Sequence, residues 1–444
     1  QATLYHALDG AGAGDGRRSI EEIRAAALSA YEQLPLPTWR RSGFWTTNVR
    51  DLDLDALEPR HHEPGADVPP IVSEALGDEP LAGRLVQRGA SVVDVQMDPE
   101  LAAQGVVLSS LEDAAREHPE LVQRHFMARL TYERDKFEAA SAAFWSGGAF
   151  LYVPPNVTVE LPFQIVYCID EPGTAQYAHT LAIGGENADF RLREYDLAAP
   201  FAGRALHAGA FELYLEAGAR CRLAHVQDWG AAEGQEVFDL STHFTRVARD
   251  AHCTWIPIHL GGHLTRQHIE FSTAEPGADM RHRGIYFTEG SEHLDLFTVD
   301  LHEAGHTTGD TVWKGASTGA SRASYEGLIK IVSGAQESHT YLQTHSMMLS
   351  PKAKVDAIPS LIVETDSVSA SHGGTVGEID EQQVFYMQAR GLSRHDAVRL
   401  IVEGYFEPIV VQLDDAALEE LVRARIAAKL AAAEADIEAY AAAK

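Results

Sequence analysis

The chain has 444 residues, 45% of them hydrophobic, which is enough for a sizeable core and excludes global disorder. Its formal net charge of −29 disfavours nucleic acid or an anionic membrane as a partner, because phosphate contacts need clustered lysine and arginine. No apolar run approaches the roughly 20 residues of a membrane span, no signal peptide is visible, and three separated cysteines favour a reducing compartment. We therefore expect a cytoplasmic protein that binds neither nucleic acid nor membrane.

The first part of the chain, residues 1–147, predicts helices joined by loops. Ser19 and Glu22 form a capping box at the start of one helix, and Ser110 is the expected N-cap of another. Between them, Pro59–Pro80 is rich in proline, glycine and acidic residues, which is typical of a mobile linker.

The second part, residues 148–376, consists of short β-rich runs separated by Gly, Asp, Asn or Pro. Examples of the expected strands are Arg220–Asp228, Val237–Val247, Cys253–Leu260, His268–Thr273, Ile285–Thr288, Leu294–His302, Ser324–Val332, His339–Leu349 and Ser360–Glu364. They recur after about a dozen residues or slightly more, which suits a β-sandwich, a barrel or a solenoid. The spacing alone does not choose among these three.

The third part, residues 377–444, predicts helices. Asp380 with Gln383 is typical of an N-terminal capping box, and Gly391 is the expected C-cap of that helix. Ser393 begins a second helix in the same way, ending near Tyr405. The alanine-rich tail predicts either a solvated helix or a docking element.

Several catalytic classes lack their motifs. The sequence contains no G-x-x-x-x-G-K-[ST], so the chain is not itself an ATPase, and no G-x-S-x-G elbow accompanies its histidines. His302–His306 reads H-E-A-G-H, but the segment predicts a glycine-containing turn and not the helix on which zinc proteases present such a pair. His259 and His263 also lie at i, i+4 outside any expected helix, and we interpret these histidines as turn or core residues. We expect no catalytic residues.

Motifs in several separated parts of the chain resemble the SufB/SufD family, scaffold proteins of iron–sulfur cluster assembly. The matching pieces are the strand with Pro359, Ser371–Gly377, Ile379–Tyr386, Ala389–Leu392, Trp313-Lys314-Gly315, Tyr325-Glu326-Gly327, Gly148–Pro154 and the arm Leu34–Trp45. The resemblance implies a mainly β fold, a right-handed parallel β-helix flanked by helical regions at both termini. It also implies a non-catalytic scaffold that works with SufB and with the ATPase SufC.

The resemblance singles out His372. In SufD proteins the matching histidine faces SufB and is implicated in building the nascent cluster, so His372 is the expected metal and cluster ligand. Ala353 stands where SufB has a cysteine, and Ala370 where many SufD proteins have one. These alanines favour a SufD-like chain. No stably bound cofactor is expected in this chain alone, only iron or an iron–sulfur cluster shared transiently with SufB.

The resemblance also implies where the partners bind. The strands within 338–372 would pair with those of SufB, and the helices that follow would dock SufC. The expected SufC contacts are Val384, Phe385, Tyr386, Arg390, Gly391, Leu400, Ile401 and Phe406. In isolation the chain could form a homodimer. Two alternatives remain open: a SufB-like homodimeric scaffold, and a metal-dependent β-solenoid enzyme such as a polysaccharide lyase or a cupin-like oxygenase.

Overall fold

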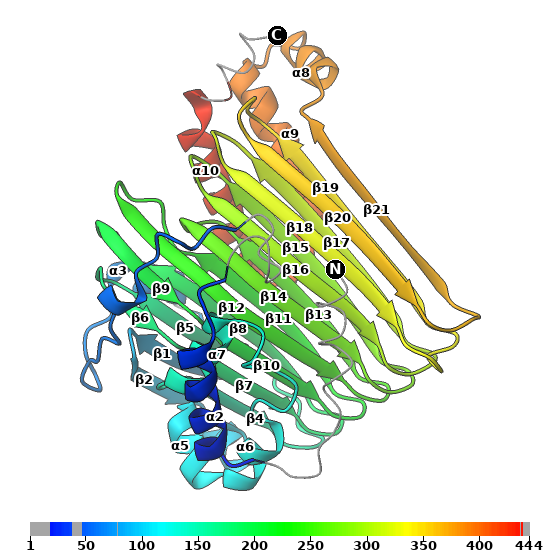
Figure 1. Ribbon diagram of the computed structural model, residues 1–444. Coiled ribbons are helices and arrows are strands. Elements are labelled where there is room, and N and C mark those ends of the chain that lie inside the picture. The colour runs from blue at the N-terminus through cyan, green and yellow to red at the C-terminus, as the bar shows by residue number, and fades with distance from the viewer. Residues whose placement is uncertain (1–17, 38–46, 78, 436, 438–444) are drawn as a thin grey trace.

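The computed structural model describes residues 18–37, 47–77, 79–435 and 437, and these form a β-solenoid of about seven turns with helices at both ends (Figure 1). Most of the arm expected at 34–45 lies outside the described residues. Two large sheets face each other, and nearly all neighbouring strands are parallel. The mainly β solenoid expected from the resemblance is confirmed.

The first sheet has ten strands. In spatial order they are β2 (Ser91–Met97), β1 (Gly83–Arg88), β5 (Phe163–Ile169), β8 (Asp189–Ala198), β11 (Arg220–Asp228), β13 (His252–His259), β15 (Asp279–Thr288), β17 (Thr308–Ser317), β19 (His339–Met348) and β21 (Ser369–Glu378). The second sheet runs in the order β20 (Lys354–Val363), β18 (Arg322–Ile331), β16 (His293–His302), β14 (Leu264–Thr273), β12 (Gln235–Val247), β10 (Ala210–Leu215), β7 (His179–Gly184), β4 (Ala149–Val153) and β3 (Val107–Ser109). In addition, β9 (Gly203–His207) pairs with β12, and β6 (Ala175–Gln176) pairs with β9.

The parallel register builds one continuous core. Asp279 of β15 pairs with Thr308 of β17, which pairs with His339 of β19, so a full turn takes roughly 30 residues and contributes one strand to each sheet. Because side chains alternate across a strand, every second residue points into the solenoid. Large apolar groups such as Trp255 and Trp313 fill that interior.

The first end of the solenoid departs from the sequence prediction. Residues 1–147 were expected to be helical, yet they supply β1, β2 and β3. β1 pairs in parallel with β5 and antiparallel with β2, while β3 pairs antiparallel with β4. A hairpin turn at Gly89 joins β1 to β2. The local β signal of these two runs is weak, and they form strands because β1 pairs in parallel with β5 of the first complete turn.

Helices cover the outer faces of both sheets (Figure 1). Their bounds are α2 (Ile20–Gln33), α3 (Pro70–Leu76), α4 (Pro99–Ala103), α5 (Leu111–Glu117), α6 (Pro119–His125), α7 (Lys136–Phe144), α8 (Glu381–Gln388), α9 (Arg394–Val410) and α10 (Ala416–Ala432), with single 3-10 turns at Leu54–Ala56 and Val411–Leu413. Helices α2, α5, α6 and α7 pack on the early strands of the second sheet, whereas α3, α9 and α10 pack on the first. None of the helices in the described part of the chain is long and apolar enough to cross a bilayer.

Helix starts follow the predicted caps in most cases. The Ser19–Glu22 box is complete, and Ser110 and Ser393 each accept the amide three residues on. Asp380 instead accepts from the amide of Gln382, so the expected box with Gln383 does not form. Helix α9 continues through Pro408 to Val410, past the end expected near Tyr405, because its apolar face stays buried against the sheet.

Candidate functional site

The last turn of the solenoid ends in two strands with no further strand beside them. β20 is the edge of the second sheet and β21 the edge of the first, and β21 lies along the outer margin of the molecule (Figure 1). Both strands are described in full, and neither contains a buried residue. Such edges present unpaired backbone groups, which are templates for pairing with another chain.

Apolar side chains are exposed on this open turn. Leu361 of β20 pairs in register with Ile329 of β18. Val363 pairs likewise with Ile331, and both β18 residues lie in the solenoid core. Leu361 and Val363 therefore continue the inward face, yet they are 37% and 41% exposed, and Val376 of β21 is 40% exposed. We call β20 and β21 together the open turn; its apolar inward face has nothing stacked on it within the described residues.

His372 lies on the open turn. Its register partner in β19 is Leu342, a fully buried core residue, so the imidazole belongs to the inward face of β21, and it is exposed because the solenoid ends there. Locally, the pair Gly373-Gly374 predicts that the strand ends next to the histidine. That prediction is wrong, because both glycines lie inside β21, held by the ladder to β19.

One exposed imidazole offers one ligand atom. Within the described residues, three or more His, Cys, Asp or Glu side chains that could share a metal occur in one group, and His372 is not part of it. A neutral imidazole suits iron, and a tetrahedral iron site needs three more donors. A tetrahedral metal site at His372 would therefore need donors from beyond the described residues.

The three cysteines lie away from the open turn. Cys168 is on β5, Cys221 on β11 and Cys253 on β13, and all three thiols are buried. Burial raises the pKa of Cys168 to about 12 and raises the other two pKa values as well. Cysteine binds metals as the thiolate, so these protonated core thiols are poor ligands and pack as small apolar side chains.

The expected SufC-contact residues divide into exposed and buried groups. On α8, Phe385 is 72% exposed and Tyr386 is 56% exposed. Val384 and Phe406 are fully buried, because they anchor α8 and α9 to the first sheet; Phe406 packs 6.4 Å from Phe287 of β15, measured between ring centres. These two residues therefore support the helices; Phe406 also lines the groove between α9 and α10, and contact of either residue with SufC stays a prediction.

The remaining expected SufC-contact residues lie on or near the surface of the C-terminal helices. The Arg390 guanidinium lies 4.2 Å from the centre of the Tyr386 ring, a cation–π contact, and Gly391 takes a φ of +95° where the chain leaves α8. Ile401 is half-buried against the sheet. Leu400 is 40% exposed and lines a groove of about 750 Å³ between α9 and α10.

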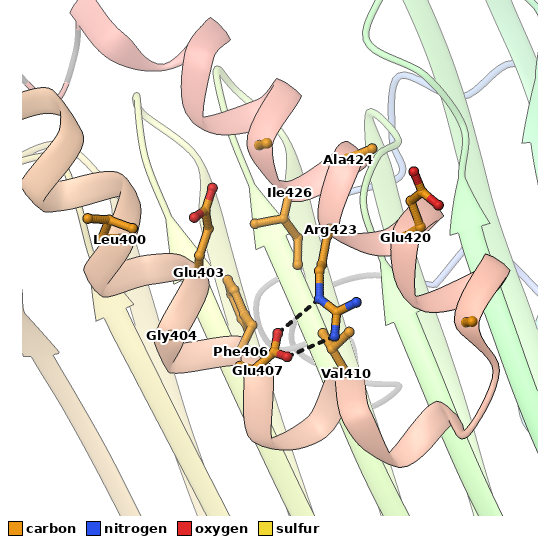
Figure 2. A pocket seen from close by; sticks show the side chains of 12 residues that line it. Leu400, Glu403, Gly404, Phe406, Glu407, Val410, Glu420, Arg423, Ala424 and Ile426 are labelled. Atoms are coloured by element: carbon orange, nitrogen blue, oxygen red, sulfur yellow. Dashed lines mark hydrogen bonds and ion pairs between the residues drawn. The ribbon is translucent and has the colours of Figure 1, made fainter.

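The groove is mainly apolar with an ion pair in its wall. Arg423 of α10 and Glu407 of α9 join across it at 2.8 Å, as Figure 2 shows, and Ile426 and Val410 contribute apolar surface. The pair is exposed, so it contributes about 1 kcal/mol or less to stability. The groove and α8 together make the C-terminal helices the second exposed apolar region of the described chain.

The histidine pairs do not form metal sites. His302 is buried and its Nδ1 lies 2.7 Å from the Thr307 hydroxyl, whereas His306 sits in a turn with φ +58° and faces Glu337. His259 points into the core while His263 is only half-buried. The sequence interpretation of these residues as turn and core histidines agrees with this geometry.

The family-like W-K-G and Y-E-G motifs have structural roles. A Cβ on Gly315 would overlap the ring of Tyr286, and a Cβ on Gly327 would lie 2.6 Å from Leu342. Lys314 donates to the carbonyl of Tyr405 at 2.6 Å and fixes α9 to the sheet. These motifs therefore encode core packing and helix attachment.

Sequence reasoning missed one interior group. Glu194 and Asp196 of β8 lie beside His225 of β11, buried inside the solenoid. The signal was present as two acidic residues, Glu194 and Asp196, at alternate positions of the strand, on the face that also carries Leu192. The group is enclosed by the core and not in a cleft, so it does not offer the open substrate site that the alternative enzyme hypothesis requires.

Comparison with known proteins decides the family. The family model "SUF system FeS cluster assembly, SufBD core domain" matches residues 167–405, more than half of the chain, and "SufBD protein N-terminal region" matches residues 90–165. The chain belongs to the SufB/SufD family. Members of this family are iron–sulfur cluster assembly proteins, so the family expected from the motifs is confirmed.

Relatives of the chain extend over most of its length. It is 27% identical over 406 residues to an iron–sulfur cluster assembly SufBD family protein of Staphylococcus epidermidis, covering 88% of this chain and 85% of the relative. A similar protein of Staphylococcus haemolyticus is 27% identical over 401 residues, with the same coverage. The iron–sulfur cluster assembly protein SufB of Bacillus subtilis is 26% identical over 406 residues, again covering 88% and 85%.

Proposed function

We propose that this family member is a SufD-like, non-catalytic scaffold subunit that pairs with SufB through its open turn and docks SufC on its C-terminal helices. The observation that carries the proposal is the uncovered last turn, with its free sheet edges, exposed apolar inward face and His372. ATP hydrolysis belongs to SufC, since the sequence has no P-loop.

Pairing through the open turn would continue both sheets into SufB. The free edge of β21 would gain a ladder of backbone hydrogen bonds, and Leu361, Val363 and Val376 would become buried. Burying these three side chains removes apolar area from water, which stabilises the pair by about 25 cal/mol for each Å². His372 would then lie at the seam, where thiolates or carboxylates of SufB can complete a cluster site.

The SufD-like assignment rests on the alanines. Ala353 and Ala370 remove the thiols that would let this chain hold a cluster alone, and the three cysteines are buried elsewhere. A cluster site that takes one imidazole from this chain and its other ligands from SufB is incomplete in either chain alone, so neither chain alone binds the cluster tightly. A scaffold must release its product, and a site divided between two chains opens when they separate.

The role of His372 is tested by co-expressing the chain with SufB and SufC and measuring iron and acid-labile sulfide after anaerobic reconstitution. We expect His372→Ala to assemble the complex and lose at least half of the cluster yield. The control His306→Ala removes another exposed histidine, in a turn away from β21, and should leave the yield unchanged. An unchanged yield in His372→Ala would show that the imidazole is not a ligand.

SufC docking is tested on α8. Phe385 is the most exposed large apolar side chain of the described residues, and Phe385→Ser should weaken SufC capture at least tenfold in a pull-down titration. Val411→Ser is the matched control, since Val411 is 50% exposed in the same helical region but lies after α9. Equal SufC affinity of the two variants would contradict docking through α8.

A SufB-like homodimer is the second candidate, and the 26% identical relative named SufB favours it. In that case two copies of this chain would share the open turns and build a cluster unaided. Reconstitution of the isolated chain with iron and sulfide separates the two candidates. A stable chromophore on the isolated chain would favour the homodimer, and its absence with recovery on adding SufB would favour the SufD-like role.

A further inference from the structure

The interior of the solenoid contains a compact group of metal-ligating side chains in its early turns. Glu194 and Asp196 follow Leu192 on the inward face of β8, and His225 follows Leu223 on the inward face of β11. Their ligand atoms all lie within 4.8 Å of one another. The three residues are only 4%, 2% and 2% exposed.

The group has an unbalanced charge. His225 Nε2 lies 2.6 Å from Asp196 Oδ2 and 3.9 Å from Glu194 Oε1, and no lysine or arginine of the described residues forms an ion pair with either carboxylate. Two buried carboxylates therefore share one imidazole. An uncompensated buried carboxylate is costly, and the cost is removed by a proton on one carboxyl or by a bound cation.

Hydrogen bonds hold one carboxylate and leave the other partly free. The Thr180 hydroxyl donates to Glu194 Oε2 at 2.6 Å and is itself 2.6 Å from the Tyr167 hydroxyl. Oxygen Oδ1 of Asp196 is buried with no hydrogen-bond partner among the described residues. The first arrangement is typical of the outer partners that orient a metal-binding carboxylate, and the second leaves a ligand atom available.

A second imidazole lies in the adjacent row. Asp196 pairs in register with Gln227 of β11, and Gln227 pairs with His259 of β13, so the row brings His259 to the group from two strands away. His259 is 2% exposed, and neither ring nitrogen has a hydrogen-bond partner among the described residues.

His259 also borders free space. It lines a small cavity of about 10 Å³ with Gly261, Gly262 and Thr265, beside the loop after β13. That volume is about the size of one water molecule. The cavity borders the His259 ring on the side of the loop after β13, and its lining does not include Glu194, Asp196 or His225.

We propose that Glu194, Asp196 and His225, with His259 as a fourth donor, bind one divalent first-row transition-metal ion such as Zn²⁺ or Fe²⁺. Two carboxylates and two imidazoles match the preference of these ions for mixed oxygen and nitrogen donors in a four-coordinate site. With metal–ligand bonds of about 2.0–2.2 Å, donor atoms lie within about 4.4 Å of one another, so Glu194, Asp196 and His225 close around an ion with small side-chain shifts, while His259 has to approach from two strands away.

This site is separate from the open turn. Four strands lie between β11 and β21 in the first sheet, so at about 4.8 Å per strand the two sites are roughly 24 Å apart. The inference therefore goes beyond the proposed scaffold function and does not depend on it. It assigns the ion to the chain's own interior, where it would brace the early turns.

The test uses the full-length chain without an affinity tag, stripped with a chelator. Titration with Zn²⁺ by calorimetry should show one saturable equivalent, and Co²⁺ should give visible ligand-field bands. Asp196→Asn and Glu194→Gln keep the side-chain volume and should each weaken Zn²⁺ binding at least tenfold and reduce the Co²⁺ bands. His225→Gln provides a third variant if one of these fails to fold, as judged by circular dichroism.

Two controls make the result specific. Asp300→Asn changes another buried inward-facing carboxylate, on β16, that accepts from Thr340, and His372→Ala removes the exposed histidine of the open turn. Both should bind Zn²⁺ as the unaltered chain does. The proposal is overturned if the unaltered chain shows no saturable equivalent, if the folded ligand variants keep its affinity, or if Asp300→Asn loses binding equally.

Discussion

Gly315 provides the sharpest test of the packing of the solenoid core. A Cβ at this position would fall inside the ring of Tyr286 on the neighbouring strand, and that ring is 1% exposed and held by a hydroxyl contact of 2.6 Å to Ser346. The ring cannot rotate out of the way within the core, so Gly315→Ala must displace it. Overpacking of this kind costs about 3 kcal/mol at the upper end of its usual range, and losing the hydrogen bond adds about 1 kcal/mol.

We therefore expect Gly315→Ala to lower the free energy of unfolding by about 4 kcal/mol, measured by urea denaturation followed by circular dichroism. Gly377→Ala is the control, because nothing lies within 4 Å of its added Cβ, and it should change stability by less than about 0.5 kcal/mol. In a Tyr286→Leu background the cost of Gly315→Ala should fall by more than half. Equal costs in both backgrounds would refute the overlap as the cause.

Two further predictions concern buried ionisable groups. Burial lowers the pKa of His282 to about 3. Below pH 6.5 the unfolded chain therefore binds a proton at this residue, whereas the folded chain does not. The contribution of His282 to the free energy of unfolding is thus complete above pH 6.5 and decreases as the pH falls toward 3. His282→Phe should therefore reduce the loss of unfolding free energy between pH 7.5 and pH 5 by about 2 kcal/mol, and an unchanged loss would count against this assignment. Lys429 is buried and pairs with two glutamates, so Lys429→Met should lower the free energy of unfolding by about 3–5 kcal/mol. The control Arg423→Met breaks an exposed ion pair and should lower it by about 1 kcal/mol or less in the same denaturation assay.

The strands were the part of the fold best predicted from the sequence. Arg220–Asp228 has the bounds of β11, and Leu294–His302 is within a residue of β16, because each is a β-rich run between turn residues. β17 was missed although it carries the W-K-G motif, since its glycines and lysine weaken the local β signal. Its parallel pairing with β15 and β19 is a long-range property that no local pattern contains.

The candidate site could be chosen from the sequence as a segment, but its geometry could not be predicted. The motif around His372 singled out a segment that forms the last strand of the solenoid, and local glycines suggested a break where the ladder to β19 maintains that strand. Burial decides the role of an apolar residue, and sequence alone did not separate Phe385, which is exposed, from Phe406, which is fully buried. The interior group around Asp196 needs two strands brought into register, which is information that only the folded chain supplies.

The most direct test of the central claim compares the two edges of the same ten-stranded sheet. Val376 on β21 and Val95 on β2 are matched in residue type and in exposure, 40% and 42%, and lie at opposite ends of the sheet. Val376→Lys and Val95→Lys are each co-expressed with SufB, and the fraction of SufB retained on the purified chain is measured. Pairing through the open turn predicts that Val376→Lys loses SufB at least tenfold while Val95→Lys retains it. Full retention of SufB by Val376→Lys, or its loss from Val95→Lys instead, would contradict the account.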